Sequence, residues 1–416
     1  MSSSGKPLPS TTLPRLPIMT FGEPWPDLND GLTYRDLIPP PHAGPYQPSQ
    51  SFTYMRLIMF LALLTIFRSL FFIFWLPNNL TGLTVIEYYS KKYKNSAPVQ
   101  GWLQRIKNKQ IKVDGAVITD PNTILRAGSE LVYHRLPWKE PHAPYLLEVL
   151  FEDNDLIALN KPSGLQVLPG GLFQQRTVLS QLEWRTNKGT SSCKQPHAVP
   201  VHRLGRGTSG VLLCAKTKLA KSCLAAYFAD GTSAVGNESC NNARFNSTRK
   251  ISKFYRALVS GIIHQDQVVI DQPIGLVKYP GVAKGLYVAS ASGKPALSKV
   301  SILERNVKNS STLVQVEIQS GRPHQIRIHL SFIGHPLLGD PLYVAGGQPS
   351  CFDPEFIDEG FAQDGGYQRP ENPVPGDCGY HLHAHQLFLA HPTTHEPIKI
   401  VAPLPSILAT EEECRG

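Results

Sequence analysis

The sequence lacks the cysteine spacing that defines two large classes of protein. Its seven cysteines are odd in number and form no Cys-x-x-Cys pair. Zinc-binding modules and disulfide-bonded secreted domains depend on close or paired cysteines, so the sequence favours neither class. We expect reduced thiols in a reducing intracellular compartment, with cytoplasm, nucleus and organelle left open. Histidines recur at 324, 329, 335, 381, 383 and 385, but no carboxylate or thiolate completes a ligand set, so no metal is predicted.

Acidic residues are also in short supply. The chain has 32 Asp and Glu against 41 Lys and Arg, which gives a formal net charge of +9. Such an excess favours a polyanionic partner such as RNA over an acidic protein, although a solvated basic surface is the alternative. The 416 residues leave room for two or three domains, and 41% hydrophobic content is enough for a core.

The N-terminal part, residues 1–82, has little that predicts a fold. Residues 1–50 are rich in Pro and Ser and have few apolar residues, which predicts that they are mostly disordered. Residues 57–76 form an apolar run, interrupted by Arg68 and Ser69, that is close to the ~20 residues needed to cross a bilayer. A central arginine costs ~2.5–3.5 kcal/mol on insertion scales. The run is therefore either a membrane segment, which we favour less, or a translated non-coding stretch.

Residues 83–136 have the pattern of a small α+β module. Apolar spacing predicts helices at 84–93 and 99–107, and short strands at 111–113 and 130–133 with turns between them. In the second helix the spacing places Trp102 and Ile106 on one side and Arg105 on the outward side. A linker at 136–146 separates this module from the rest of the chain.

Residues 147–405 alternate between strands and short helices, interrupted by patternless insertions at 230–250 and 344–380. We expect strands at 211–215 and 253–261 and hairpins at 149–160 and 298–319. Thr177 and Thr217 are suitable N-caps for two helices. The second helix has an apolar stripe at Leu219, Cys223, Ala226 and Tyr227, and a third runs from Pro323 to Gly334 with Ile326, Leu330 and Ile333 buried.

Three polar motifs occupy the loops and ends of these elements. Residues 202–210 read His-Arg-Leu-Gly-Arg-Gly-Thr-Ser-Gly and lead into an apolar strand; we call this stretch the signature loop. Residues 253–261 read Lys-Phe-Tyr-Arg-Ala-Leu-Val-Ser-Gly, and residues 321–327 read Gly-Arg-Pro-His-Gln-Ile-Arg, followed by Gly-Asp-Pro-Leu-Tyr at 339–343. In this order the motifs resemble those of the RluA-type RNA pseudouridine synthases, including the plant type. Residues 83–136 resemble the alpha-L RNA-binding module found in front of many of these enzymes.

The resemblance implies an α+β fold with a mixed, mainly antiparallel sheet, packed helices and an RNA cleft. It also implies an isomerase that converts uridine in rRNA or tRNA to pseudouridine as a monomer, without metal, nucleotide or other cofactor. Target bases inside a helix have to be flipped out. By motif position, Tyr255 stacks on the uracil or accepts a proton, and Arg327 holds the catalytic carboxylate. RNA and base-flipping contacts fall on His202, Arg203, Leu204, His324 and Gln325, and phosphate contacts of the alpha-L module on Arg105, Lys107, Lys109 and Lys112.

One position departs from the family. Its catalytic aspartate falls on Gly205, which offers neither a nucleophile nor a base. Loss of a key catalytic group can reduce a rate by roughly 10⁶, and Arg327 would be left as an unpaired buried charge. The sequence therefore leaves an active synthase that uses another group, which the retained Arg203, Tyr255 and Arg327 favour, or a catalytically silent RNA-binding paralogue, which Gly205 favours. A third hypothesis, a membrane-anchored RNA tether, rests only on residues 57–76.

Overall fold

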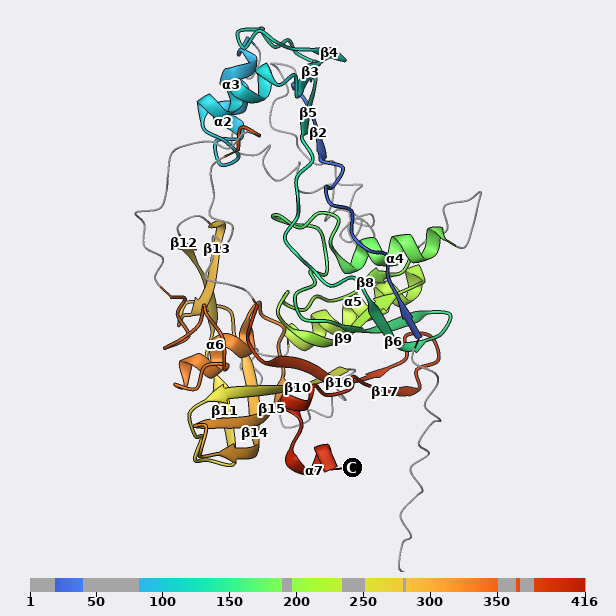
Figure 1. Ribbon diagram of the computed structural model, residues 1–416, viewed down its shortest axis with the longest axis vertical. Coiled ribbons are helices and arrows are strands. Elements are labelled where there is room, and N and C mark those ends of the chain that lie inside the picture. Colours follow the sequence, from blue (N-terminus) through green and yellow to red (C-terminus); the bar gives the residue numbers. More distant parts are fainter. Residues whose placement is uncertain are drawn as a thin grey trace, which may run out of the picture. The chain divides into compact units, whose positions relative to one another are not determined.

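A computed structural model describes residues 19–39, 82–188, 197–233, 251–279, 282–350, 364–366 and 378–415 (Figure 1). The chain divides into two compact units. Unit 1 comprises Met1–Pro26, Glu140–Phe352 and Val374–Gly416, and unit 2 comprises Asp27–Lys139 and Asp353–Pro373. The apolar run at 57–76 and most of the two predicted insertions lie outside the described residues. In the described part, no helix is long and apolar enough to cross a membrane.

Unit 2 packs two helices against a four-stranded antiparallel sheet. The helices are α2 (Val85–Lys92) and α3 (Val99–Lys107), as predicted. The strand order is β2 (Leu32–Leu37), β5 (Glu130–Arg135), β3 (Ile111–Val113) and β4 (Ala116–Val117). Thr84 and Glu87 form a reciprocal capping box that starts α2. The core of unit 2 is aromatic: Tyr89 stacks on Trp102 with ring centroids 4.6 Å apart.

The prediction of disorder in residues 1–50 is wrong for residues 19–39. Strand β2 pairs along six residues with β5, and β1 (Met19–Phe21) pairs with β6 of unit 1. Tertiary pairing supplies the hydrogen bonds and burial that the local composition does not show. Residues 19–39 therefore belong partly to unit 1 and partly to unit 2. The predicted domains, which began at residues 83 and 147, left this segment out.

Unit 1 is built on an eleven-stranded sheet, which confirms the predicted α+β class. Nine strands follow one path: β1, β6 (Leu147–Glu152), β7 (Leu156–Lys161), β9 (Ser209–Ala215), β16 (Leu382–Ala390), β10 (Ile251–Ser260), β15 (Ser311–Ile318), β14 (Leu297–Asn306) and β11 (Gln267–Asp271). Strands β8 (Val199–Pro200) and β17 (Pro397–Val401) pair with β9 and β16. Only the β9–β16 pair is parallel among the described strands. A separate hairpin joins β12 (Ile274–Tyr279) and β13 (Val282–Ala289).

The sheet of unit 1 buries both of its faces. Alternate residues of β9 belong to two hydrophobic clusters: Leu212 and Cys214 to one, Val211 and Leu213 to the other. The first cluster also holds Leu204, Tyr255 and Tyr380, and we call this side of the sheet the signature face. The second cluster includes residues of helix α5, and we call this side the α5 face.

The helices of unit 1 begin largely where the sequence predicts. Thr177 caps α4 (Val178–Asn187), and the Thr217 hydroxyl accepts the Ala220 amide at the start of α5 (Lys218–Ser233). The stripe predicted for α5 is confirmed at Tyr227 but is one position out elsewhere, because Ala220 and Leu224 are buried whereas Leu219 is 57% exposed and Cys223 is half-buried.

Helix α6 (Gln325–Phe332) starts later than predicted. His324 is its N-cap in the left-handed conformation, at φ 56°, so Pro323 precedes the helix rather than opening it. The predicted buried stripe is confirmed at Ile326 and Leu330. A 3-10 turn, η4 (Ser406–Leu408), and a short helix, α7 (Glu411–Arg415), close the chain.

Candidate active site

The signature loop is fixed to the sheet at its middle and at its far end. Lys161 is fully buried, and its ammonium group donates to the backbone carbonyls of Pro162, Leu165 and Arg206 at 2.8, 2.8 and 3.1 Å. At the far end, Gly210 has φ +102°, and a β-carbon there would lie 2.2 Å from the Ala384 carbonyl oxygen. Glycine is thus required where β16 approaches β9, and the loop is held rigidly on the sheet.

Gly205 faces two hydroxyl groups rather than open space. A β-carbon on Gly205 would lie 3.0 Å from the Tyr380 hydroxyl oxygen and 3.4 Å from Thr208 Oγ1. These hydroxyls are 3.3 Å apart, within reach of a long hydrogen bond. The place next to Gly205 is therefore occupied by the phenol of Tyr380, which lies 172 residues beyond Thr208 in the chain.

Arg327 lies behind this phenol and keeps an acidic partner, contrary to the expectation that it is unpaired. Its Nε and Nη2 each donate to a different oxygen of Asp340 at 2.7 Å, with 2% and 0% of the two side chains exposed. Burial acts to lower the pKa of Arg327, but the hydrogen bonds to Asp340 together with the charge interactions with Tyr380, Asp340 and Tyr343 outweigh it, and the pKa is raised. Its Nη1 is buried and has no hydrogen-bond partner among the described residues. The Arg327 guanidinium also lies 4.3 Å from the centre of the Tyr380 ring.

Asp340 itself is not available for chemistry. Besides Arg327, its Oδ1 accepts the backbone amides of Leu342 and Tyr343 at 2.9 and 3.2 Å. With no exposed side-chain surface, this carboxylate orients the arginine and cannot reach a substrate.

Tyr255 lies in the same buried cluster as Leu204 and Tyr380. It is 8% exposed on β10, between Val316 of β15 and Ala384 of β16. Burial raises the pKa of its phenol far above the usual value. A neutral ring at this place can stack on a base that enters the site, so the expected stacking role stays open. The raised pKa makes the phenol less often ionised and proton acceptance by Tyr255 less favourable.

The first three residues of the signature loop have different surroundings. His202 is turned inward: its Nε2 accepts the Leu213 amide at 3.0 Å, its ring stacks on Phe228, and burial lowers its pKa to about 3. Arg203 is exposed, and Leu204 is buried in the cluster of the signature face. Of these three side chains, that of Arg203 is the exposed one, and the RNA contacts expected of all three stay predictions.

The two polar residues at the start of α6 serve mainly within the fold. Gln325 is 2% exposed: its carbonyl accepts from Ser320 and Arg322, and its amide donates to Leu297 and Ser298. Its side-chain oxygen and nitrogen are thus engaged within the fold, and its assignment to RNA contact stays a prediction. His324 is half-buried, with Nδ1 3.0 Å from the Tyr343 hydroxyl.

The predicted phosphate contacts of unit 2 divide into two groups. Lys107, Lys109 and Lys112 are exposed. Arg105 is 2% exposed; it donates to Ser96 and the Asp364 carbonyl and lies 4.3 Å from the Trp102 ring centre. The prediction that Arg105 faces outward is wrong, because its methylene stem and planar guanidinium pack on the aromatic core.

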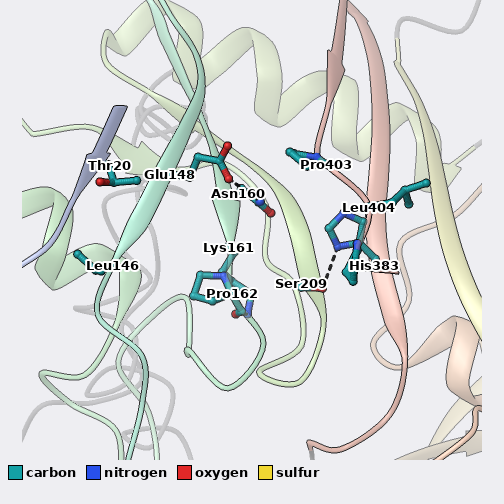
Figure 2. A pocket seen from close by; sticks show the side chains of 11 residues that line it. Thr20, Leu146, Glu148, Asn160, Lys161, Pro162, Ser209, His383, Pro403 and Leu404 are labelled. Carbon is teal, nitrogen blue, oxygen red and sulfur yellow. Dashed lines mark hydrogen bonds between the residues drawn. The ribbon is translucent and has the colours of Figure 1, made fainter. Parts of the chain in front are cut away.

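A cavity of about 410 Å³ lies on the α5 face, away from Tyr255 and Tyr380. Figure 2 shows Glu148 and Asn160 on one side of it, from β6 and β7, and Ser209 and His383 on the other, from β9 and β16. The Ser209 hydroxyl lies 2.8 Å from His383 Nδ1, and burial lowers the pKa of His383 to about 4. The neutral histidine joins the two parallel strands, which gives it a structural role.

Two residues of the site were missed in the sequence. Asp340 belongs to the Gly-Asp-Pro-Leu-Tyr motif, whose spacing after α6 was a usable signal. Tyr380 lies at the end of a long insertion, where nothing in the local pattern points to it. The mainly antiparallel sheet and the buried arginine beneath a Gly-rich loop are those of the pseudouridine synthase fold.

The comparisons with known proteins agree with this class. The sequence model of the family described as RNA pseudouridylate synthase matches residues 155–332. RNA pseudouridine synthase 5 of Arabidopsis thaliana is 60% identical over 403 residues, covering 95% of this chain and 99% of that protein. An uncharacterized RNA pseudouridine synthase of Synechocystis is 40% identical over 329 residues, 79% and 96% of the two chains. Ribosomal large subunit pseudouridine synthase D of Pseudomonas aeruginosa is 33% identical over 310 residues, 73% and 82%. The chain belongs to the RNA pseudouridine synthase family.

Proposed function

We propose that this chain isomerises uridine to pseudouridine in RNA, although Gly205 replaces the family's catalytic aspartate. The observation that carries the proposal is the intact site around that glycine. Arg327 is buried and charged, keeps one nitrogen without a hydrogen-bond partner in the described part of the chain, and lies against a phenol that faces Gly205. Because an apolar pair of similar volume is often equally stable or more so, the retained charged pair favours a use of this site beyond folding.

In this proposal each side chain acts on an extruded uridine. Arg203, exposed at the signature loop, enters the gap that the flipped base leaves in the RNA. Tyr255 and Leu204 form the apolar floor on which the uracil ring stacks. Arg327 supplies a fixed positive charge for the anion that forms when the base leaves C1′.

RNA is held in addition by unit 2. Lys107, Lys109 and Lys112 are exposed and lie at the end of α3 and on the following strand. Such contacts neutralise phosphates without reading sequence. We take the substrate to be a structured RNA such as rRNA or tRNA, bound by a monomer.

The proposal is tested with total RNA from cells that lack this protein. Purified full-length chain is incubated with that RNA, and pseudouridine is measured by mass spectrometry of nucleosides. New pseudouridine is expected with the wild type, and a loss of about 10²-fold or more with Arg327→Met, as for removal of an electrostatic group in an active site. RNA binding without any new pseudouridine would instead support the silent paralogue.

A further inference from the structure

We infer that Tyr380 is the acid–base residue of this site and that its hydroxyl takes the place beside Gly205, where a side chain would be in tight contact with it. The inference rests on the proposed function and names the group that performs its proton transfer. A β-carbon placed on Gly205 would lie 3.0 Å from the Tyr380 hydroxyl oxygen. Contacts this short require one of the two groups to move, and Tyr380 is packed with only 4% exposed.

The reaction defines what the residue has to do. The C1′–N1 bond breaks with its electron pair leaving on the base, and that pair returns to C1′ through C5, so that the C1′–C5 bond forms. The hydrogen on C5 then leaves as a proton, its bonding pair returns to the ring, and N1 gains a proton. One side chain that takes the proton from C5 and delivers it to N1 completes the balance without any co-reactant.

The other ionisable groups around Arg327 are poorly suited to this step. Asp340 has no exposed side-chain surface and accepts four hydrogen bonds. Tyr343 donates its hydroxyl to the Tyr287 carbonyl at 2.7 Å and also contacts His324. Arginine does not release its proton at ordinary pH.

Tyr380 has the geometry that these groups lack. Its hydroxyl points to the signature loop, beside Thr208 and Gly205, where the nucleotide enters in the proposed function. Its ring lies 4.3 Å from the Arg327 guanidinium, closer than the 5.0 Å of the Tyr343 ring. Among the described residues, the titratable groups near it include Asp340, Tyr343 and, from β10, Tyr255.

The first experiment removes the hydroxyl alone. Tyr380→Phe keeps the ring on Arg327, and we expect it to lower the pseudouridine turnover rate by about 10²–10⁴-fold, the usual contribution of a positioned acid–base group. RNA affinity is expected to stay within about twofold. Tyr343→Phe is the matched control, because it removes a hydroxyl from the other ring that faces the same guanidinium, and its turnover is expected to remain near that of the wild type.

The second experiment moves the acid–base group to the loop. Gly205→Asp in the Tyr380→Phe background has the hydroxyl removed from its path, and we expect it to recover activity, whereas Gly205→Asp alone does not exceed the wild type. The pH profile distinguishes the two groups: turnover by the wild type rises towards alkaline pH, and turnover by the double variant is level above about pH 5, because a carboxylate ionises far below a phenol. If Tyr380 were only structural, the pH profile of turnover would be the same in the wild type and in the double variant.

Two outcomes overturn the inference, and they separate it from the proposed function. If wild type makes pseudouridine and Tyr380→Phe makes it equally fast, Tyr380 is not the acid–base residue although the chain is a synthase. If wild type makes none and only variants with Gly205→Asp do, the proposed function fails and the Tyr380 role with it.

Discussion

The ion pair between Arg327 and Asp340 is expected to dominate the local stability of unit 1. Removal of the carboxylate in Asp340→Ala leaves a guanidinium in a place where only 2% of its side chain is exposed. It also removes the acceptor of two backbone amides, those of Leu342 and Tyr343. Loss of one partner from a buried pair costs about 3–5 kcal/mol, because the other charge stays buried without compensation.

Hydrogen exchange measured peptide by peptide is the suitable assay, since the chain has two units and a single unfolding transition cannot be assumed. Exchange in the β10 and β15 peptides should report a loss of about 3–5 kcal/mol in opening free energy for Asp340→Ala. Asp266→Ala is the control: it breaks the ion pair with Arg305, whose acid is 86% exposed, and should cost about 1 kcal/mol or less. The double variant Arg327→Met/Asp340→Leu should recover most of the loss. Equal losses of opening free energy in Asp340→Ala and Asp266→Ala, or no recovery in the double variant, would refute this account of the pair.

Three further predictions follow from the same structure. Replacement of Lys107, Lys109 and Lys112 with Ala should weaken RNA binding across sequences and reduce the log–log salt slope by about 0.9 or less per lost contact, whereas an unchanged slope would mean that they do not contact phosphate. Burial holds the pKa of His329 at about 4 and that of His202 at about 3, below the unfolded value of 6.5, so the unfolded state binds more protons between these values. The free energy of unfolding should therefore fall as pH drops from about 7 to 4, and it should fall less in His329→Gln. A free energy of unfolding that does not change over this pH range would contradict the prediction. A deletion of residues 57–76 should leave RNA binding unchanged. A truncation that starts at Leu83 also removes β1 and β2, so the amides of β5 and β6 should exchange their hydrogens faster, and amides that stay protected in those strands would disprove this.

Local pattern predicted the elements whose hydrogen bonds and burial are mostly local. Both helices of unit 2 and the caps at Thr177 and Thr217 came from side-chain spacing and N-cap chemistry. Strands β1 and β2 could not be predicted in this way, since their sequence becomes a strand only when it pairs with β6 and β5. The stripe of α5 was predicted one residue out of register because apolar residues lie on neighbouring positions of that helix and only packing on the sheet chooses between them.

The candidate site was predictable as a set of motifs but not as a set of contacts. The motif at 321–327 indicated Arg327, yet its pairing with Asp340 depends on the segment after α6 folding back beneath it. Arg105 was misplaced because a charged residue on a helix was assumed to face water, whereas its flat guanidinium packs on Trp102. Tyr380 has no local signal at all, because its importance arises from the absence of a side chain at Gly205.

Release of the C5 hydrogen tests the central claim most directly, since isomerisation cannot occur without it. RNA transcribed with uridine that carries tritium at C5 is folded and mixed with purified wild-type protein, and tritium in the solvent is counted against pseudouridine formed. The account predicts that both appear together in equal amounts, with Gly205 in place. Stable binding of the RNA with no tritium released, for rRNA and tRNA substrates alike, would contradict it.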